Sequence, residues 1–351
     1  MNSLSAILIV SAVVVGTVTA NPSCSIGFCS EDSDCPATSY CMKNKPAAND
    51  SCWCCHAATP TIGITGISGK VEMPMAGLGT WLYNSTLAEA STSLALKYGY
   101  YLVDTALGYK NQDGIGRALK ASGRSRSSYF ITSKIPGGLN ADDTKAALDT
   151  GLAQLELDFV DLMLLHFPSD WAQKNTGKAQ RQEQWLALES WAKSGKARAI
   201  GVSHYCKRHI QDVLEVATVP IAVNQVQYHV GMGMSGPNAT DDKEFDLANG
   251  IVYQSFSPLC GPCGTSALID GPLVTKIGAR HNKTGAQVSL KWQIQQNVPI
   301  IPKTHKVSHM EENIDMFSWD LTEEEMKTLT NAAKPPVAGD GHGNSGDCAV
   351  P

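Results

Sequence analysis

The chain has little charge and few aromatic residues. Charged side chains make up 17% of its 351 residues, aromatic side chains make up 7%, and the formal net charge is -5. Lysine and arginine form no basic patch, which argues against a nucleic-acid-binding protein. We therefore expect a small-molecule partner and no nucleic acid. The length allows one large core, or a large domain with a small one.

Long hydrophobic runs are also scarce. Residues 1–20 carry no charged side chain, but their apolar centre, residues 6–15, is too short to span a bilayer comfortably. Val18 and Ala20 fit the small-residue pattern before a cleavage site, so we expect a signal peptide over residues 1–20. Because this segment lacks lysine and arginine, a short membrane anchor is the alternative. The signal peptide predicts a protein that is secreted or lies in the secretory-pathway lumen, with no membrane attachment after cleavage.

Cysteine is absent between residues 55 and 206 and concentrated before that gap. Residues 21–60 contain few large aliphatic side chains, so this segment needs disulfides to hold a fold and is predicted to be a Cys-rich disulfide module. A zinc site is the alternative, because Cys52, Cys54, Cys55 and His56 are all possible ligands. The seven cysteines of the segment are Cys24, Cys29, Cys35, Cys41, Cys52, Cys54 and Cys55. Four glycosylation sequons, at Asn49, Asn84, Asn238 and Asn282, predict a glycoprotein if the chain enters the secretory pathway.

Residues 61–337 alternate short apolar runs with amphipathic segments. This alternation predicts parallel strands joined by helical crossovers, and eight such units match a (β/α)8 TIM barrel. The apolar runs are residues 75–80, 100–105, 129–134, 159–166, 197–203, 221–227, 251–257 and 298–303. Ahead of them, an alternating segment around Ser68-Gly69 predicts an N-terminal hairpin that closes one end of the barrel.

A further helix is predicted after the eighth run. Thr322 and Glu325 have capping-box spacing, and Leu321 and Met326 are placed for a hydrophobic staple. Residues 338–351 form a glycine-rich tail without regular structure.

Chemically active side chains recur where the predicted strands end. Asp104, Lys134 and His166 end three of the runs, and Tyr109 lies five residues after Asp104. In this fold the working site lies at the carboxyl ends of the strands, so these side chains are expected to meet. Lys134 beside Tyr109 would lower the phenol pKa, and Asp104 would keep the buried lysine charged. Such a set can protonate an oxygen while another group delivers a hydride, and no metal-ligand set competes with it.

The chain resembles the aldo-keto reductase family over about residues 62–335. The matching segments include "MAGLGTW", "DTALGY", "ITSK", "DLMLLHFP", "GVSHY", "VNQVQYH", "SFSPL" and "IPKTHKVSHMEENI". The resemblance implies NADPH-dependent reduction of an aldehyde or ketone to an alcohol, with Tyr109 as proton donor. Lys134 would tune Tyr109, Asp104 would pair with Lys134, and His166 would orient the carbonyl.

The resemblance also implies contacts to the cofactor and the substrate. The cofactor contacts would be Gly79, Thr80, Ser203, His204, Gln225, Phe256, Ser257, Leu259, Lys303, Thr304, His309, Glu312 and Asn313. Trp81 and Phe167 would line the substrate pocket, whereas Trp185 and Trp191 are expected in the core.

Some positions depart from the family pattern. His204 replaces the usual asparagine, and His309 replaces an arginine at the 2'-phosphate. Without that arginine the preference for NADPH is expected to weaken, so NADH is possible. We expect a monomer.

Two other functions are compatible with the sequence. Cys260-Gly-Pro-Cys263 has the form of a dithiol redox site, although its barrel context favours a local disulfide that acts as a structural staple. The alternative is that the oxidation state of this pair changes the loop and therefore the NADPH affinity. A secreted binding protein that uses an inactive or weakly active reductase barrel as a scaffold is the other. Cys206 is expected to be a free thiol, and a cysteine of the N-terminal module is expected to pair with Cys348.

Overall fold

A computed structural model describes residues 59–332, except 171, 173, 175 and 233–241, together with three short strands nearer the N-terminus. The chain separates into two compact units, residues 1–57 and 58–351. In the first unit, β1 (Phe28–Cys29), β2 (Tyr40–Met42) and β3 (Cys52–Cys55) form an antiparallel sheet with β3 in the middle. The predicted signal peptide, the glycine-rich tail and Cys348 lie outside the described residues. Of the zinc alternative, the structure describes only the backbone of Cys52–Cys55, so that alternative is not tested.

The second unit is built on a parallel sheet of seven strands in sequence order. Its strands are β6 (Gly77–Gly79), β7 (Leu102–Asp104), β8 (Phe130–Ile135), β9 (Val160–Leu165), β10 (Ala197–Ser203), β11 (Val223–Gln227) and β12 (Val252–Phe256). Ile300 bridges both edges of this sheet, pairing with Ala76 before β6 and with Ser255 in β12. These bridges bring the first and last strands together, which confirms the predicted barrel.

The eighth predicted strand is reduced to single bridges. Residues 298–303 include Pro299 and Pro302, and proline has no N–H to contribute to a strand ladder. The other backbone groups of this segment still connect the two edge strands of the sheet, β6 and β12. On the β6 side, the Gly77 amide donates to the Ile300 carbonyl at 2.9 Å. The amide of Ser255 donates to the carbonyl of Pro299 at 2.8 Å.

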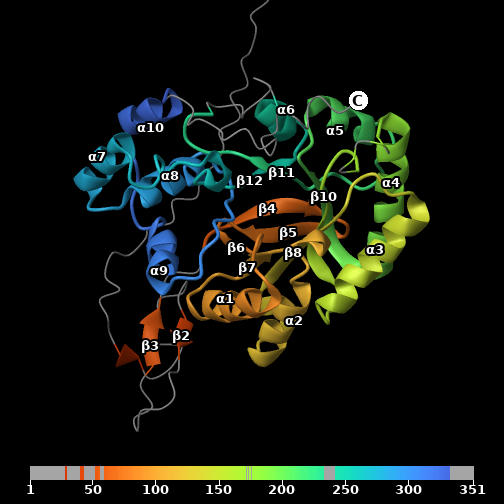
Figure 1. The fold of residues 1–351 in the computed structure, drawn as a ribbon, viewed down its shortest axis with the longest axis horizontal. Coiled ribbons are helices and arrows are strands. Elements are labelled where there is room, and N and C mark those ends of the chain that lie inside the picture. Colours follow the sequence, from red (N-terminus) through yellow and green to blue (C-terminus); the bar gives the residue numbers. More distant parts are fainter. Residues whose placement is uncertain are drawn as a thin grey trace, which may run out of the picture. The chain divides into compact units, whose positions relative to one another are not determined.

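Helices surround this sheet, as Figure 1 shows. They are α1 (Ser85–Lys97), α2 (Gln112–Ala121), α3 (Ala141–Gln154), α4 (Lys178–Trp191), α5 (Lys207–Leu214), α6 (Asp242–Ala248), α7 (Pro272–His281), α8 (Gly285–Ile294), α9 (Val307–Asp315) and α10 (Glu323–Thr330). Trp185 and Trp191 are 0% and 5% exposed, which confirms that both belong to the core. None of the helices in the described part of the chain has the length and apolar character needed to cross a bilayer.

A β-hairpin covers the amino-terminal end of the barrel. It pairs β4 (Thr61–Gly66) with β5 (Gly69–Pro74), and Gly69 has a φ of 123°, which favours glycine at the turn. Ile64 and Met73 of the hairpin belong to one buried cluster with side chains of the barrel strands. The amide of Ile67 donates to the Arg198 carbonyl at 2.9 Å, which fixes the turn to the start of β10. The predicted hairpin is therefore present and closes this end of the barrel.

The last described helix, α10, begins at the capping box that the sequence predicts. The Thr322 hydroxyl accepts from the Glu325 amide at 3.2 Å, and the Glu325 carboxylate accepts from the Thr322 amide at 3.0 Å. Leu321 is buried in a cluster against which Met326 packs. Both features fix where α10 starts.

Candidate active site

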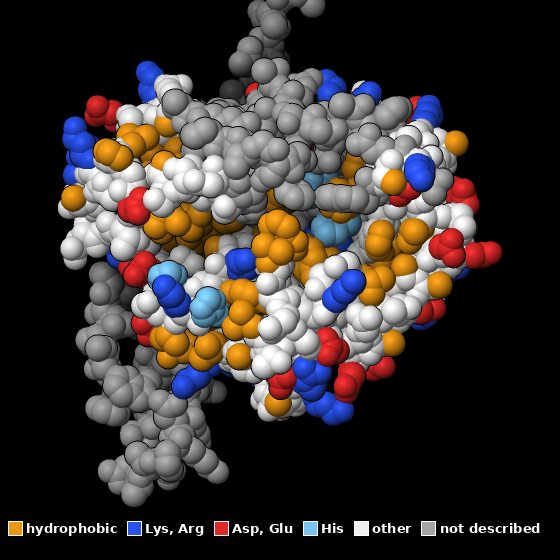
Figure 2. Space-filling view, viewed as in Figure 1, with side chains coloured by type: hydrophobic (Ala, Val, Ile, Leu, Met, Phe, Trp, Pro, Cys, Tyr) orange, Lys and Arg blue, Asp and Glu red, His pale blue; other side chains and the backbone are white. Residues whose placement is uncertain are grey.

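A cavity of about 720 Å³ opens at the carboxyl ends of the barrel strands. Figure 2 shows hydrophobic and histidine side chains gathered around the hollow on this face. Thirteen of the residues singled out from the sequence line it, namely Gly79, Thr80, Trp81, Asp104, Tyr109, His166, Phe167, His204, Gln225, Phe256, Ser257, Leu259 and Lys303. The volume falls within the range of small-molecule sites, about 300–1,000 Å³.

A buried ion pair lies at the base of the cavity. Lys134 Nζ lies 2.5 Å from Asp104 Oδ1, and both side chains are almost completely buried. The amide Nε2 of Gln225 donates to the second carboxylate oxygen, Asp104 Oδ2, at 2.8 Å. Lys134 Nζ also donates to the carbonyl of Thr105 at 3.2 Å. Both charges thus have hydrogen-bond partners, as buried charges require.

Burial and pairing act in opposite directions on this pair. Burial raises the pKa of Asp104 and lowers that of Lys134, whereas their mutual attraction works against both shifts. The short contact and the hydrogen bond from Gln225 stabilise the charged forms. We therefore assign the pair as carboxylate and ammonium, which places a positive charge behind Tyr109, a residue of the cavity wall.

Tyr109 lies next to this charge. It ends the short helix η2 (Leu107–Tyr109), and its hydroxyl is 3.4 Å from Lys134 Nζ. Burial raises the pKa of the phenol well above 10, and the Asp104 carboxylate raises it further. The expectation that Lys134 lowers this pKa is therefore wrong for this structure, because burial outweighs the nearby ammonium. The phenol is protonated at neutral pH, as a proton donor must be.

His166 faces Tyr109 across the cavity. Their ring centroids are 5.6 Å apart in an edge-on arrangement. Burial lowers the pKa of His166 well below 6.5, and the electrostatic interactions with Lys134 and His204 lower it further. The imidazole is therefore neutral at pH 7 and can donate one hydrogen bond.

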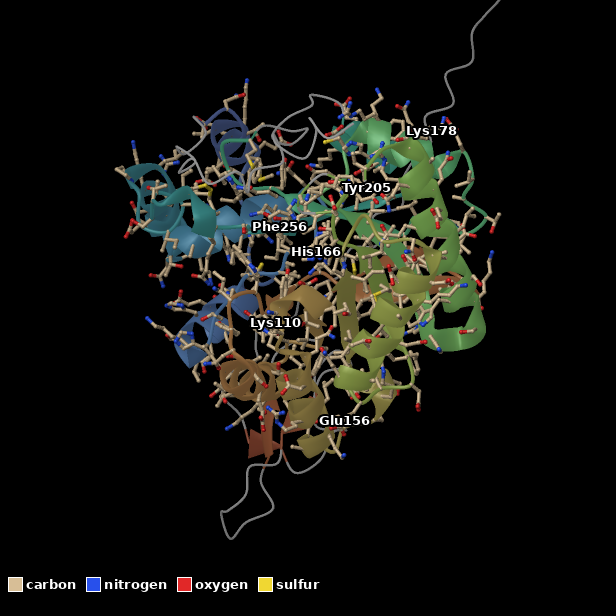
Figure 3. The ribbon with its side chains drawn as sticks, turned by 45° about the vertical axis from the view of Figure 1, so that its right-hand side comes forward. Lys110, Glu156, His166, Lys178, Tyr205 and Phe256 are labelled. Carbon is tan, nitrogen blue, oxygen red and sulfur yellow. A yellow bond between two sulfur atoms is a disulfide. The ribbon has the colours of Figure 1, made fainter. Side chains whose placement is uncertain are left out.

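Four rings form a continuous column along one wall. His166 stacks on Phe167, Phe167 lies against His204, and His204 lies against Phe256, with successive centroids 4.5, 4.6 and 4.6 Å apart. Figure 3 shows two of them, His166 and Phe256, close together near the middle of the barrel. Two imidazole and two phenyl rings therefore line this wall, with the last two pairs tilted by 41° and 34°. Trp81, 38% exposed, adds a further aromatic ring to the lining.

Several predicted cofactor residues lie outside the cavity wall. Ser203 is buried, and its hydroxyl donates to the Gln225 carbonyl at 2.8 Å. Thr304 and His309 face each other, with Oγ1 and Nδ1 3.4 Å apart. Glu312 and Asn313 belong to α9, and Asn313 is 5% exposed and hydrogen-bonds Tyr100. Their roles stay predictions.

One wall of the cavity includes residues that the sequence did not single out, next to the predicted contacts Ser257 and Leu259. It is formed by the loop after β12, through Gly261, Gly264, Thr265, Ser266 and Ile269. The loop departs from its strand with unusual backbone geometry, since Ser257 and Cys260 have φ values of 48° and 53°. Neither residue is glycine, so composition did not reveal the turn. The glycines that follow β12 in the sequence, Gly261 and Gly264, were the one indication of an irregular loop at this position.

The Cys260–Cys263 pair is closed as a disulfide in this loop. The two side chains are 0% and 3% exposed, in contrast to the accessible thiol that a dithiol oxidoreductase presents. The predicted local disulfide is therefore confirmed. Cys206 is also disulfide-bonded, so the expectation of a free thiol there is wrong.

Comparison with known proteins relates the chain to reductases. The model of the "Aldo/keto reductase family" matches residues 76–334. A glyoxal reductase of Bacillus subtilis is 38% identical over 266 residues, which cover 74% of this chain and 88% of the relative. The methylglyoxal reductase DkgA of Yersinia pestis is 32% identical, with coverage of 74% and 88%.

Solved structures agree with this relationship. An aldo-keto reductase from a Medee basin deep-sea metagenome superposes with a TM-score of 0.69 at 29% identity, covering 77% of this chain and 96% of that one. The aldose reductase of Schistosoma japonicum gives a TM-score of 0.67 at 27% identity, with coverage of 78% and 92%.

Proposed function

Because the chain belongs to the aldo/keto reductase family of oxidoreductases, we propose that it reduces the carbonyl group of a small aldehyde or ketone with NADPH. The observation that carries the proposal is the contact of Lys134 with both Asp104 and Tyr109 at the base of the cavity. This arrangement places a protonated phenol next to a fixed positive charge, on the face of the barrel where substrates bind.

The cavity has groups that suit a nicotinamide cofactor. Phe256 and Gln225 supply an aromatic face and an amide, which match a flat ring that carries a carboxamide. Lys303 is an exposed cation at the cavity, and no carboxylate pairs with it among the residues that the structure describes. A lysine in this position suits a phosphate group. When bound, the cofactor supplies the hydride.

The residues of this chain supply the proton and the orientation. Tyr109 holds a proton at Oη and can transfer it to a carbonyl oxygen that reaches the same point. The Lys134 ammonium, 3.4 Å away, stabilises the phenolate that this transfer leaves. His166 is neutral and can donate a second hydrogen bond to the same oxygen, which orients the carbonyl. Asp104 and Gln225 hold Lys134 in place and therefore act as positioning residues.

We propose small, reactive carbonyl compounds as substrates. The relatives named as glyoxal and methylglyoxal reductases act on compounds of two and three carbons. The lining of rings, with few charged groups, suits a compact and uncharged carbonyl compound.

The test is a titration of the purified protein with NADPH, followed by turnover of glyoxal, methylglyoxal and a panel of larger aldehydes and ketones. Tyr109→Phe should keep NADPH binding and lose at least about 100-fold in kcat, the usual contribution of a positioned general acid. Absence of NADPH binding would contradict the cofactor assignment. Turnover by Tyr109→Phe at the wild-type rate would contradict the role of the phenol.

The cofactor preference is tested with the same protein. His309 stands where the family has an arginine, so the ratio of kcat/KM with NADPH to that with NADH should rise in His309→Arg. An unchanged ratio would show that residue 309 does not contact the 2'-phosphate.

A further inference from the structure

A second cluster of reactive side chains lies behind the loop that follows β12. The ligand atoms of His229, Cys260 and Cys263 all lie within 4.8 Å of one another, and the three residues are buried. Gln227, 1% exposed, completes the group, with its amide nitrogen 3.9 Å from Cys260 Sγ and 3.3 Å from His229 Nε2. None of the four side chains takes part in the proposed reduction, so this cluster needs its own explanation.

The backbone brings these groups together from two segments. Gln227 ends β11 and His229 follows two residues later, so the alternation of an extended chain sends both side chains to the same side. Tyr228, between them, stacks on Trp292 with ring centroids 5.1 Å apart. Cys260 precedes the short helix η5 (Gly261–Cys263) and Cys263 ends it, and this turn brings their sulfurs to the same point. A Cys-x-x-Cys turn facing a histidine from another segment is a common arrangement of metal ligands.

His229 has the orientation that a metal ligand requires. Its Nδ1 lies 2.9 Å from the carbonyl of Val230, and this contact fixes the proton on Nδ1. Nε2 then carries the lone pair, and it lies 3.9 Å from Cys263 Sγ and 3.3 Å from the amide nitrogen of Gln227. Two ligand atoms of a tetrahedral zinc ion, each about 2.0–2.3 Å from the metal, lie about 3.3–3.8 Å apart. The nitrogen and the sulfur are already close to this separation.

Gln227 gives further support for a metal site, separate from the positions of the two cysteines and the histidine. Its carbonyl oxygen Oε1 is buried and, among the residues that the structure describes, has no hydrogen-bond partner. A buried amide oxygen without a partner costs about 1–3 kcal/mol. In the present arrangement Nε2, not Oε1, lies beside Cys260 Sγ and His229 Nε2. Rotation of the amide by half a turn exchanges the two atoms, so that Oε1 faces the cluster as a ligand for a metal ion and Nε2 takes the position without a partner.

We propose that, once the Cys260–Cys263 disulfide is reduced, Cys260, Cys263, His229 and Gln227 form a binding site for a thiophilic metal ion such as Zn²⁺. Disulfide and metal exclude each other, since both use the same two sulfur atoms. A small dithiol is the reductant: it loses two electrons and two protons and becomes a cyclic disulfide, while each cysteine sulfur gains one electron and one proton. Metal binding then displaces the two thiol protons and forms two metal–sulfur bonds. The inference does not depend on the reductase activity.

The test is an anaerobic titration of the full chain with Co²⁺ after treatment with dithiothreitol, followed by the absorption of cobalt–thiolate bonds. Mass spectrometry of the Cys260–Cys263 peptide verifies that the bond is open. Wild type should bind one equivalent of Co²⁺ more than Cys260→Ser/Cys263→Ser, and Zn²⁺ should displace it. The cysteines of residues 1–57 are common to both proteins and cancel in the difference.

Two single variants keep the test decisive if the double variant does not fold. His229→Ala retains all cysteines and should weaken binding of the additional equivalent by at least about tenfold, and Gln227→Leu should weaken it by about tenfold. Equal binding by wild type, His229→Ala and Gln227→Leu would overturn the proposal. A disulfide that resists dithiothreitol in the folded chain would overturn it as well, as would the same additional equivalent in unreduced protein.

Discussion

Lys134 and Asp104 illustrate how one buried contact serves both stability and chemistry. Each charge has lost its water, and each is compensated by the other at 2.5 Å. Gln225, 121 residues along the chain from Asp104, completes the hydrogen bonds of the carboxylate. The sequence predicts that these residues meet, because each lies at the carboxyl end of a predicted strand. In a parallel barrel all these ends lie on one face.

Removal of Lys134 alone should destabilise the protein strongly. Lys134→Met leaves the Asp104 charge buried without its partner, so the free energy of unfolding should fall by about 3–5 kcal/mol. Asp104→Asn/Lys134→Met removes both charges and should recover most of this loss without recovering turnover. Urea denaturation of the three proteins measures the difference. Equal stability of the single and double variants would show that the pair is not charged.

Asp246 is a buried carboxylate outside the candidate site. Its side chain is 0% exposed, and Asn224 Nδ2 donates to Oδ2 at 2.8 Å. Burial raises the pKa of Asp246 well above 3.8. A folded-state pKa above the unfolded value favours folding at low pH, and this contribution is lost as the pH rises from about 4 toward the folded pKa.

Asp246→Asn should therefore stabilise the protein at pH 7. We expect a gain of about 1 kcal/mol, because the neutral amide can keep the hydrogen bond from Asn224 without the cost of burying a charge. The gain should shrink as the pH falls toward 4 and vanish below it, where the wild-type carboxyl is protonated in both states. Thermal unfolding at several pH values measures it, with the exposed Asp158→Asn as the control that should change nothing. A variant less stable than wild type at pH 7 would contradict the prediction.

Among the helices, α10 depends on one carboxylate at its start. Burial alone would raise the pKa of Glu325, but hydrogen bonds from the Thr322 backbone and from His281 lower it to about 2. The Glu325 carboxylate lies 2.8 Å from His281 Nε2. A folded-state pKa below the unfolded value of about 4.3 gives stability that is present above pH 4.3. This stability is lost as the pH falls through the folded value near 2.

Glu325→Gln tests this charge while preserving the cap, because glutamine also fits the third position of a capping box. We expect a loss of about 1–2 kcal/mol at pH 6–7, which should shrink as the pH falls from about 4 to 2. Chemical denaturation across this range measures it. A difference that stays constant at low pH would show that the hydrogen bonds, rather than the charge, carry the effect.

The loop between Phe256 and Gly264 links the disulfide to the cavity. Ser257, Cys260 and Gly264 all have left-handed backbone angles, with φ of 48°, 53° and 66°. Opening the Cys260–Cys263 bond should release this strained turn, which carries the predicted cofactor contacts Ser257 and Leu259.

Reduction of the bond should therefore weaken NADPH binding by about tenfold, equivalent to about 1.4 kcal/mol. Cys260→Ala/Cys263→Ala should bind like the reduced protein and should not respond to reductant. This control also separates the effect from reduction of the Cys206 disulfide, which both proteins share. Unchanged affinity after verified reduction would leave the bond a structural support only.

The whole barrel could be predicted from the alternation of apolar runs and amphipathic segments, while its closure could not be predicted in detail. Pro299 and Pro302 replace the eighth ladder by bridges through Ile300, a result that depends on backbone pairing rather than on hydrophobic pattern. The pKa of Tyr109 was mispredicted for a similar reason. The sequence predicts that Lys134 lies near Tyr109, because both follow strand ends on one face of the barrel. The burial of the phenol, which raises its pKa, depends on side-chain packing and is seen only in the structure.

The cavity should survive without the N-terminal unit. All residues that line it belong to the unit of residues 58–351, which has its own buried clusters. A protein that starts at residue 58 should therefore bind NADPH as the full chain does, as fluorescence titration would show. Loss of binding in a folded truncated protein would assign residues 1–57 a part in the cofactor site.

The hairpin of β4 and β5 also bears on the order of events in a catalytic cycle. It fills the amino-terminal end of the barrel with side chains such as Ile64 and Met73, so the cavity opens toward the opposite face. Under the proposed role, Tyr109 gives up one proton in each turnover. With the base of the barrel sealed, that proton must be replaced from the cavity side. Protonation of the phenolate then has to wait for the alcohol product to leave, so proton uptake follows product release in each turnover.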